Sequence, residues 1–148
     1  WLVAHCNYVD DTHIQCLAAT ETSVAYCPIA SEYFGHKNHR YRDMLAAGVN
    51  VCLGTDSIIC QHSDEPQPLG VLPAMRRLFQ RDGTPPDALL RMATINGLTA
   101  LGISPAMATL APGAPAKLVT ATINTHDAAD PLEQLLAGRG TLSPLPLE

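Results

Sequence analysis

The sequence predicts an α/β fold with parallel strands, and three observations point to it. Short apolar runs alternate with amphipathic helical segments in the order strand, helix, strand, helix, strand, helix. Neighbouring parallel strands need a long connection to return to the same end of the sheet, and the predicted helices would provide these crossover connections. The predicted strands are apolar with little alternation, which is typical of strands covered on both faces. Parallel α/β folds place their chemistry at the carboxyl ends of the strands, so those ends are where a site is expected.

The first 28 residues are predicted to form a strand, a helix and a second strand. The first strand spans residues 1–5 and is apolar up to its last residue. Asp10 or Asp11 then begins a helix over about 11–20 as its N-cap. Three apolar residues lie on one face of that helix: Ile14, Leu17 and Ala18. The second strand, residues 23–28, is rich in β-prone residues and ends at a proline.

A loop and a helix connect the second strand to the third. The stretch "ASEYFGHKNHRYR", residues 30–42, is interpreted as a loop that leads into a helix within residues 39–48. That helix ends at Gly48 as its C-cap. Its apolar face consists of Tyr41, Met44 and Leu45. The third strand, residues 49–54, stops abruptly on "GTDS", which places Asp56 at the strand tip.

The next part of the chain is predicted to be a polar loop and three helices. The loop covers residues 55–68, and a helix over about 69–80 follows it. The apolar side of this helix consists of Val71, Leu72, Met75, Leu78 and Phe79. Two short helices fill "TPPDALLRMATINGLTALG": Thr84 is expected to cap the first, with Pro85 in its first turn, and Gly102 to end the second.

Composition excludes several classes of protein. With 148 residues, 47% of them hydrophobic and 16% charged, the chain can bury a core. A net charge of -5 disfavours nucleic-acid and anionic-membrane partners, and no apolar stretch approaches the ~20 residues of a membrane helix. Five cysteines without a CxxC pair indicate reduced thiols and a cytoplasmic location. Because the chain starts on Trp1 inside a strand, we expect it to be the C-terminal part of a longer polypeptide.

Three strand tips carry groups capable of chemistry. His5, Cys27 and Asp56 follow the first, second and third strand. A histidine and an acid on neighbouring tips make a site able to hold a metal or move a proton. The simpler interpretations are a turn-capping aspartate and a structural histidine. Cys27 and Cys60 are nucleophile candidates, but no helix N-terminus or paired histidine is predicted beside them, which favours packed thiols.

Four segments together resemble a known family. They are "LVAHCNYVDDTHIQCLAATETSVAYCP", "YRDMLAAGVNVCLGTDS", "RMATINGLTALGI" and "LAPGAPAKLV". In this order they resemble the C-terminal half of the amidohydrolase superfamily, from about residue 2 to residue 138. The similarity is to the aminohydrolase and chlorohydrolase branch, which includes cytosine, guanine and S-adenosylhomocysteine deaminases and acts on purines, pyrimidines and triazines.

The resemblance implies a specific architecture. The family fold is a metal-dependent (β/α)8 TIM barrel with a small β-sandwich built from both chain ends. Residues 1–104 would be the C-terminal part of the barrel, with the three predicted strands as strands six to eight. Residues 105–148 would be the C-terminal contribution to the composite sandwich. Lys117 departs from the family pattern, which commonly has an acidic residue at this position.

The resemblance also implies a chemistry. The family binds a divalent metal, for which zinc is our first choice and iron the alternative, and Asp56 matches the strand-eight ligand. His5 matches the strand-six histidine that orients the attacking hydroxide, so the catalytic pair would be His5 and Asp56. The 148 residues contain no HxH motif and no counterpart of the strand-five histidine and glutamate. We therefore expect the fragment alone to be inactive and to bind the metal weakly or not at all.

The loop after the second strand supplies candidate substrate contacts. Glu32 and Tyr33 are candidates for contacts with a ring. A cationic cluster follows them: His36, Lys37, His39, Arg40 and Arg42. The predicted substrate-binding set is Glu32, Tyr33, His36 and His39, and the cluster would recognise a carboxylate or phosphate. The competing interpretation is a solvated loop. A second metal site at His36 and His39 is disfavoured because neither has an acidic or thiolate partner beside it.

Two functions of different classes follow. The first is a metal-dependent hydrolase that deaminates or dechlorinates a small heterocyclic substrate by attack of metal-activated water. The alternative is a non-catalytic α/β binding module that holds an anionic small molecule with the basic loop. An incomplete barrel leaves open strand edges, so we also expect a homo-oligomer.

Overall fold

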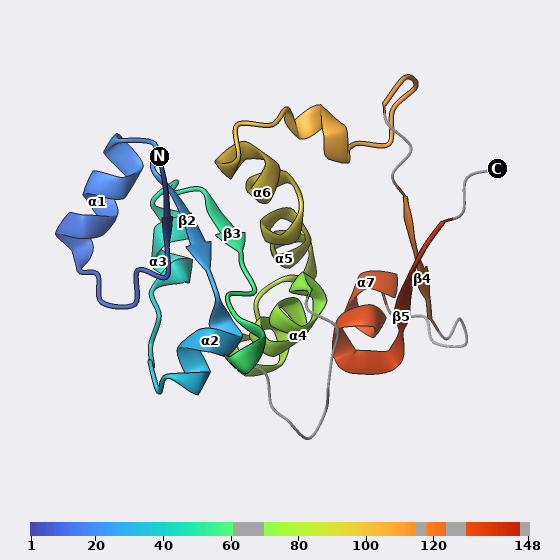
Figure 1. Cartoon of the computed structure of the whole chain (residues 1–148), viewed down its shortest axis with the longest axis horizontal. Coiled ribbons are helices and arrows are strands. Elements are labelled where there is room, and N and C mark those ends of the chain that lie inside the picture. The colour runs from blue at the N-terminus through green and yellow to red at the C-terminus, as the bar shows by residue number, and fades with distance from the viewer. Residues whose placement is uncertain (61–69, 115–117, 124–129, 146–148) are drawn as a thin grey trace.

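Three parallel strands form the sheet that carries the predicted site (Figure 1). The computed structural model describes residues 1–60, 70–114, 118–123 and 130–145. The strands are β1 (Leu2–Ala4), β2 (Ser23–Tyr26) and β3 (Val51–Leu53), in the order β1-β2-β3. Val3 lies opposite Val24, which lies opposite Val51. The three predicted strands, their parallel direction and the α/β class are confirmed.

The crossover helices of the first half follow from local signals. Helix α1 (Asp11–Ala19) begins after Asp10, whose carboxylate accepts a hydrogen bond from the His13 backbone at 2.9 Å, so the predicted cap is confirmed. Helix α3 (Tyr41–Ala46) is shorter than predicted. Gly48 follows its end in the left-handed conformation, with φ of 83°.

Helix α2 (Pro28–Tyr33) lies in a segment that we expected to be a strand end and a loop. Pro28 does not simply stop β2. It occupies the first helical position, where the missing N–H costs nothing because that group has no partner within a helix. The six residues are too few for an apolar period to reveal the helix in the sequence.

The three predicted helices of the second half are present, and the first lies about two residues later in the chain than predicted. Helix α4 (Val71–Asp82) ends at Gly83, and α5 (Pro86–Ala93) and α6 (Ile95–Ala100) follow. The prediction that Thr84 caps α5 was wrong, because Pro85 is the residue before the first helical position. The Thr84 hydroxyl instead lies 2.5 Å from the Tyr41 hydroxyl.

The remaining described elements are short. They are the 3-10 turns η1 (Ile58–Cys60) and η2 (Pro105–Ala108), β4 (Val119–Thr122), α7 (Pro131–Gln134), the π-helical turn η3 (Leu135–Arg139) and β5 (Thr141–Pro144). Strands β4 and β5 pair antiparallel, with Val119 opposite Pro144. The 3-10 turn η1 lies within the predicted polar loop, most of which falls outside the described residues, as does Lys117. None of the described helices is both long and apolar enough to cross a lipid bilayer.

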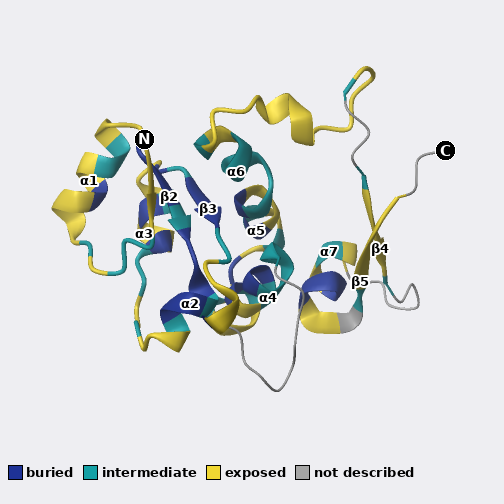
Figure 2. Cartoon of the chain, in the orientation of Figure 1, coloured by how far each residue is buried: buried dark blue, intermediate teal, exposed yellow. Residues whose placement is uncertain are grey.

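One hydrophobic core joins the sheet to the helices (Figure 2). Val24 and Tyr26 of β2 and Val51 and Leu53 of β3 belong to it. Helices α1, α3, α4 and α5 contribute Ile14, Tyr41, Met44, Ala74, Met75, Leu78, Leu89 and Met92. The alternate β-strand positions, such as Ala25 and Cys52, therefore face the opposite side of the sheet.

The expectation that every strand is covered on both faces was wrong for β1. Leu2 is 43% exposed and Val3 is 37% exposed, whereas β3 is buried throughout. Both β1 and β3 are edges of the described sheet, but helices α3, α4, α5 and α6 pack against β3, whereas the main described neighbour of β1 is β2 alone.

Candidate active site

The structure brings His5 and Asp56 together across the ends of the sheet. His5 follows β1 and Asp56 follows β3, and the His5 Nε2 atom lies 3.8 Å from Asp56 Oδ2. Both backbones are left-handed, with φ of 66° and 56°. Their side chains are 42% and 31% exposed, so both groups are open to a ligand. At this separation the two atoms are not directly hydrogen bonded, and an oxygen atom to one side of the pair could contact both of them.

A pocket of about 210 Å³ holds this pair. Its walls come from the turn after β1, from helix α2 and from the turn after β3. The lining residues are His5, Asn7, Ala30, Ser31, Phe34, His36 and Asp56. The pocket therefore combines two imidazoles, a carboxylate and two uncharged polar side chains beside the Phe34 ring.

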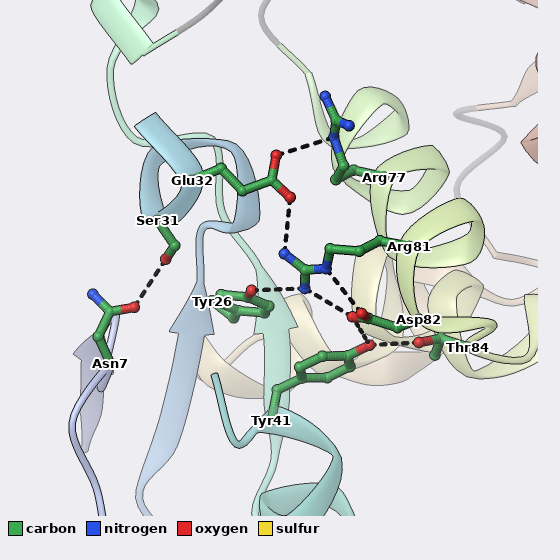
Figure 3. Close-up of polar contacts among 9 residues, drawn as sticks. All are labelled: Asn7, Tyr26, Ser31, Glu32, Tyr41, Arg77, Arg81, Asp82 and Thr84. Carbon is green, nitrogen blue, oxygen red and sulfur yellow. Dashed lines mark hydrogen bonds and ion pairs between the residues drawn. The ribbon is translucent and has the colours of Figure 1, made fainter. Parts of the chain in front are cut away.

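Two polar side chains in the pocket are oriented by neighbours. The Ser31 hydroxyl donates to Asn7 Oδ1 at 2.9 Å, as Figure 3 shows. The Tyr8 hydroxyl lies 2.6 Å from His36 Nδ1, so that nitrogen is already engaged. Asn7 and Ser31 were not among the predicted contacts. Asn7 is two residues after His5, and this closeness in the sequence could have predicted that it lines the same pocket. Ser31 could not be predicted in this way, because it lies on helix α2, which was not predicted.

Of the predicted substrate contacts, His36 lines the pocket and Glu32 does not. The Glu32 carboxylate instead lies 2.9 Å from Arg81 Nη1 and 3.2 Å from Arg77 Nε (Figure 3). Tyr33 is exposed and packs edge-on against Phe34 at a centroid distance of 5.0 Å. Phe34, rather than Tyr33, is the aromatic residue of the pocket lining.

His39 also lies outside the pocket lining. Its Nε2 atom lies 2.5 Å from the His5 carbonyl oxygen, and its ring stacks on Tyr26 at a centroid distance of 3.7 Å. Burial lowers the pKa of His39; its hydrogen bond to the His5 backbone opposes this effect, and the charges of Arg81 and His5 add to the lowering. The imidazole is therefore neutral at neutral pH and belongs to the support of the site.

Both arginines of the cationic cluster contact groups outside the pocket, and Arg40 pairs with carboxylates. Arg40 Nη2 lies 2.6 Å from Asp11 Oδ1, and Arg40 Nε lies 2.7 Å from Asp43 Oδ2. Arg42 donates to the Asp82 carbonyl oxygen at 3.4 Å. The Arg40 charge is thus already compensated within the protein.

Cys27 lies close to the site carboxylate, Asp56. It precedes α2 and is buried, and a Cβ atom added at Gly54 would lie 2.8 Å from its Sγ. Burial, and secondarily the charge of Asp56, raises the pKa of Cys27 to about 11. The position at the start of a helix was not predicted, but the thiol is protonated at neutral pH and is not an activated nucleophile.

The donor set fits only part of a metal centre. Among the residues that the structure describes, no group of three or more His, Cys, Asp or Glu side chains is placed to hold a metal ion. His5 and Asp56 supply two donors, whereas zinc sites use three or four protein ligands. A complete centre would need ligands from elsewhere.

Comparison with known proteins shows what this chain is similar to. The model of the amidohydrolase family matches residues 1–136. The chain is 33% identical to the 5'-deoxyadenosine deaminase of Methanoregula boonei, over 93% of this chain and 33% of that protein. It is 28% identical to the S-triazine hydrolase of Gordonia rubripertincta, over 92% of this chain and 29% of that enzyme.

Solved structures show the same relationship at the level of the fold. The guanine deaminase of E. coli superposes with a TM-score of 0.58 at 23% identity, over 69% of this chain and 24% of that chain. The chain thus spans about a third of the length of the curated relatives it matches.

Proposed function

Because this chain belongs to the amidohydrolase family, we propose that it is part of a metal-dependent hydrolase that deaminates or dechlorinates a heteroaromatic ring. Its fold is α/β and of the TIM-barrel type, and amidohydrolases are generally metal dependent. Named relatives are deaminases and a triazine hydrolase, which supports a purine, pyrimidine or triazine as the substrate. The observation that carries the proposal is the approach of His5 to Asp56 within one pocket.

Each residue of the pair has a proposed role. Asp56 would be one ligand of the metal, zinc in the first place and iron as the alternative. When bound, such an ion lowers the pKa of a coordinated water toward neutrality. The Asp56 carboxylate is able to accept a proton from a water in the pocket. His5 Nε2 faces the same space and would fix the direction in which that water attacks.

The proposal includes the place of the chain in a barrel. Strands β1, β2 and β3 would be strands six to eight, within a barrel segment that spans residues 1–104. The pair β4 and β5 would belong to a β-sandwich segment, residues 105–148. Their antiparallel pairing, separate from the parallel sheet, supports this division. The free cysteines support a cytoplasmic location.

Mutation of the pair in the complete polypeptide tests the function. The protein is loaded with zinc or iron and screened on purines, pyrimidines and triazines for release of ammonia or chloride. Asp56→Asn and His5→Gln should each lower kcat/KM by at least ~100-fold, because each removes a group that acts on the attacking water. His13→Gln is the matched control, since His13 is exposed on α1 and lies outside the pocket lining. Full turnover in Asp56→Asn would refute the proposed site.

The 148-residue chain on its own should be inactive. With two donors at the site, it should bind zinc too weakly to survive gel filtration in the presence of a chelator. Metal content measured by mass spectrometry checks this. A stoichiometric, chelator-resistant ion would contradict the incomplete ligand set.

The alternative, a binding module for an anionic molecule, has less support from the geometry. The described lining of the pocket contains no arginine or lysine, and its one carboxylate would repel an anion. The Arg40 charge is held by two carboxylates outside the pocket.

A further inference from the structure

The end of β1 has an unusual backbone. His5 and Cys6 are consecutive non-glycine residues in the left-handed region, with φ of 66° and 54°. L-amino acids adopt this region rarely, and a pair of them needs support from the surrounding structure. The amides of the turn are held, since His5 N–H donates to the Ala25 carbonyl oxygen and Cys6 N–H donates to that of Ala4, both at 2.9 Å. No backbone N–H among the turn and loop bonds of the described residues donates to the His5 carbonyl oxygen, so this oxygen needs another partner.

His39 is that partner. A carbonyl oxygen only accepts hydrogen bonds, so His39 Nε2, at 2.5 Å, must carry the proton. The other ring nitrogen, Nδ1, is buried and has no hydrogen-bond partner among the described residues. Protonation there would place a buried charge beside Arg81, which agrees with the lowered pKa of His39. The imidazole is thus fixed as a neutral donor aimed at one backbone oxygen.

The His39 ring is itself held in place from helix α4. It stacks on Tyr26 with an interplanar angle of 14°. Arg81 Nη2 donates to the Tyr26 hydroxyl at 3.2 Å, and the same guanidinium pairs with Glu32 and Asp82 (Figure 3). A continuous set of contacts therefore runs from α4 through Tyr26 and His39 to the backbone of His5.

We infer that His39 is a positioning residue: its hydrogen bond to the His5 carbonyl oxygen holds the left-handed turn that directs the His5 imidazole toward Asp56. His39 acts through His5 and does not line the pocket, so a substrate would not contact it. The inference rests on the proposed function for its kinetic consequence alone, because the structural role of the bond is independent of the reaction.

Three variants of the complete polypeptide distinguish the effect of the His39 N–H donor from that of its ring, which stacks on Tyr26. His39→Gln keeps an N–H donor near the Nε2 position, and His39→Asn carries the same donor on a side chain too short to reach His5. His39→Phe keeps a ring on Tyr26 but lacks the donor. We expect kcat to fall by ~10- to 100-fold in the Phe and Asn variants with KM within ~3-fold, and to stay within ~3-fold of wild type in the Gln variant.

Crystal structures of the variants give a readout that needs no turnover. In the Phe and Asn variants, His5 should leave the left-handed region or its Nε2 should move away from Asp56, whereas the Gln variant should keep both. If His39→Phe does not fold, the Gln and Asn pair makes the same comparison. An unchanged His5 in the Asn variant, or loss of its orientation in the Gln variant, would overturn the inference. If the wild-type polypeptide turned over none of the tested rings while the Phe and Asn variants still displaced His5, the proposed function would be refuted and the positioning role would stand.

Discussion

At the scale of single residues, the surroundings of a group decide what its chemistry is. Cys27 and Asp56 both follow strands at the same end of the sheet, yet their states differ. Asp56 is partly exposed in the pocket, whereas Cys27 is packed against Gly54 and remains a thiol. A strand tip is therefore only a place where chemistry is possible, and packing decides which side chain reaches the pocket.

This difference predicts a pattern of cysteine reactivity. Thiolates react with iodoacetamide, and the pKa of Cys27 is raised to about 11 by burial, so its thiol stays protonated until the pH approaches that value. At pH 8, Cys16, which is exposed, should be alkylated while Cys27 is not. Peptide mass spectrometry of the labelled protein measures both sites, and Cys16 is the internal control. Labelling of Cys27 at a rate equal to that of Cys16 would contradict this assignment.

The sequence was enough to predict that His5 and Asp56 lie close together, but not where Glu32 and His39 would lie. The meeting of His5 with Asp56 was predictable because parallel strands end at one edge of the sheet. The positions of Glu32 and His39 were not, since each is set by residues far away in the sequence. Glu32 turns toward Arg77 and Arg81 on α4, and His39 turns toward the backbone of His5. No local pattern encodes such long-range partners.

At the scale of elements, the segment "ATINGLTA" has a structural explanation. Asn96 Nδ2 donates to the Val51 carbonyl oxygen at 2.8 Å, and Asn50 Nδ2 donates to the Asn96 carbonyl oxygen at 3.0 Å and to the Ser23 hydroxyl at 2.9 Å. These side-chain bonds fasten α6 to β3 and β2. Asn96 therefore links α6 to the sheet, and this structural role accounts for its place in the segment.

Removal of the Asn96 side-chain amide should destabilise the protein. In Asn96→Ala, the Val51 carbonyl of a buried strand loses its side-chain partner, which should lower the free energy of unfolding by about 1–3 kcal/mol. Thr99→Ala on the exposed face of the same helix is the control and should change it by less than ~0.5 kcal/mol. Urea denaturation followed by circular dichroism compares the two, and equal stabilities would refute the role of Asn96.

Element boundaries show where local signals suffice. The cap at Asp10 and the glycine after α3 were readable because both act within one turn of their helix. Helix α2 and the start of α5 were not. The former has six residues, and the latter begins after the first of two adjacent prolines, either of which fits a first turn.

At the scale of the whole molecule, the alternation of strands and helices was enough to predict a parallel α/β fold. It did not indicate how β1 would be covered, because burial of an edge strand depends on chain elements far from it. Among the described strands, β1 pairs only with β2, and its outer edge presents unpaired backbone groups.

That edge predicts self-association of the 148-residue protein. Because the Trp1 carbonyl and the His5 amide point toward β2, the groups of Leu2 between them point outward. Leu2→Pro removes an outward N–H without breaking the β1–β2 ladder. Sedimentation velocity should show an average mass that rises with concentration for the wild type and rises less for Leu2→Pro. A wild-type protein that stays monomeric at every concentration would contradict this expectation.

The left-handed corners at His5 and Asp56 set stability against function. Glycine would relax either corner, and each non-glycine residue there costs roughly 1–2 kcal/mol of folding free energy. A screen that selects only for thermal stability would therefore favour glycine at both positions, and these variants would lack the side chains that face the pocket. Libraries designed to stabilise this protein should therefore keep His5 and Asp56 fixed and vary other positions.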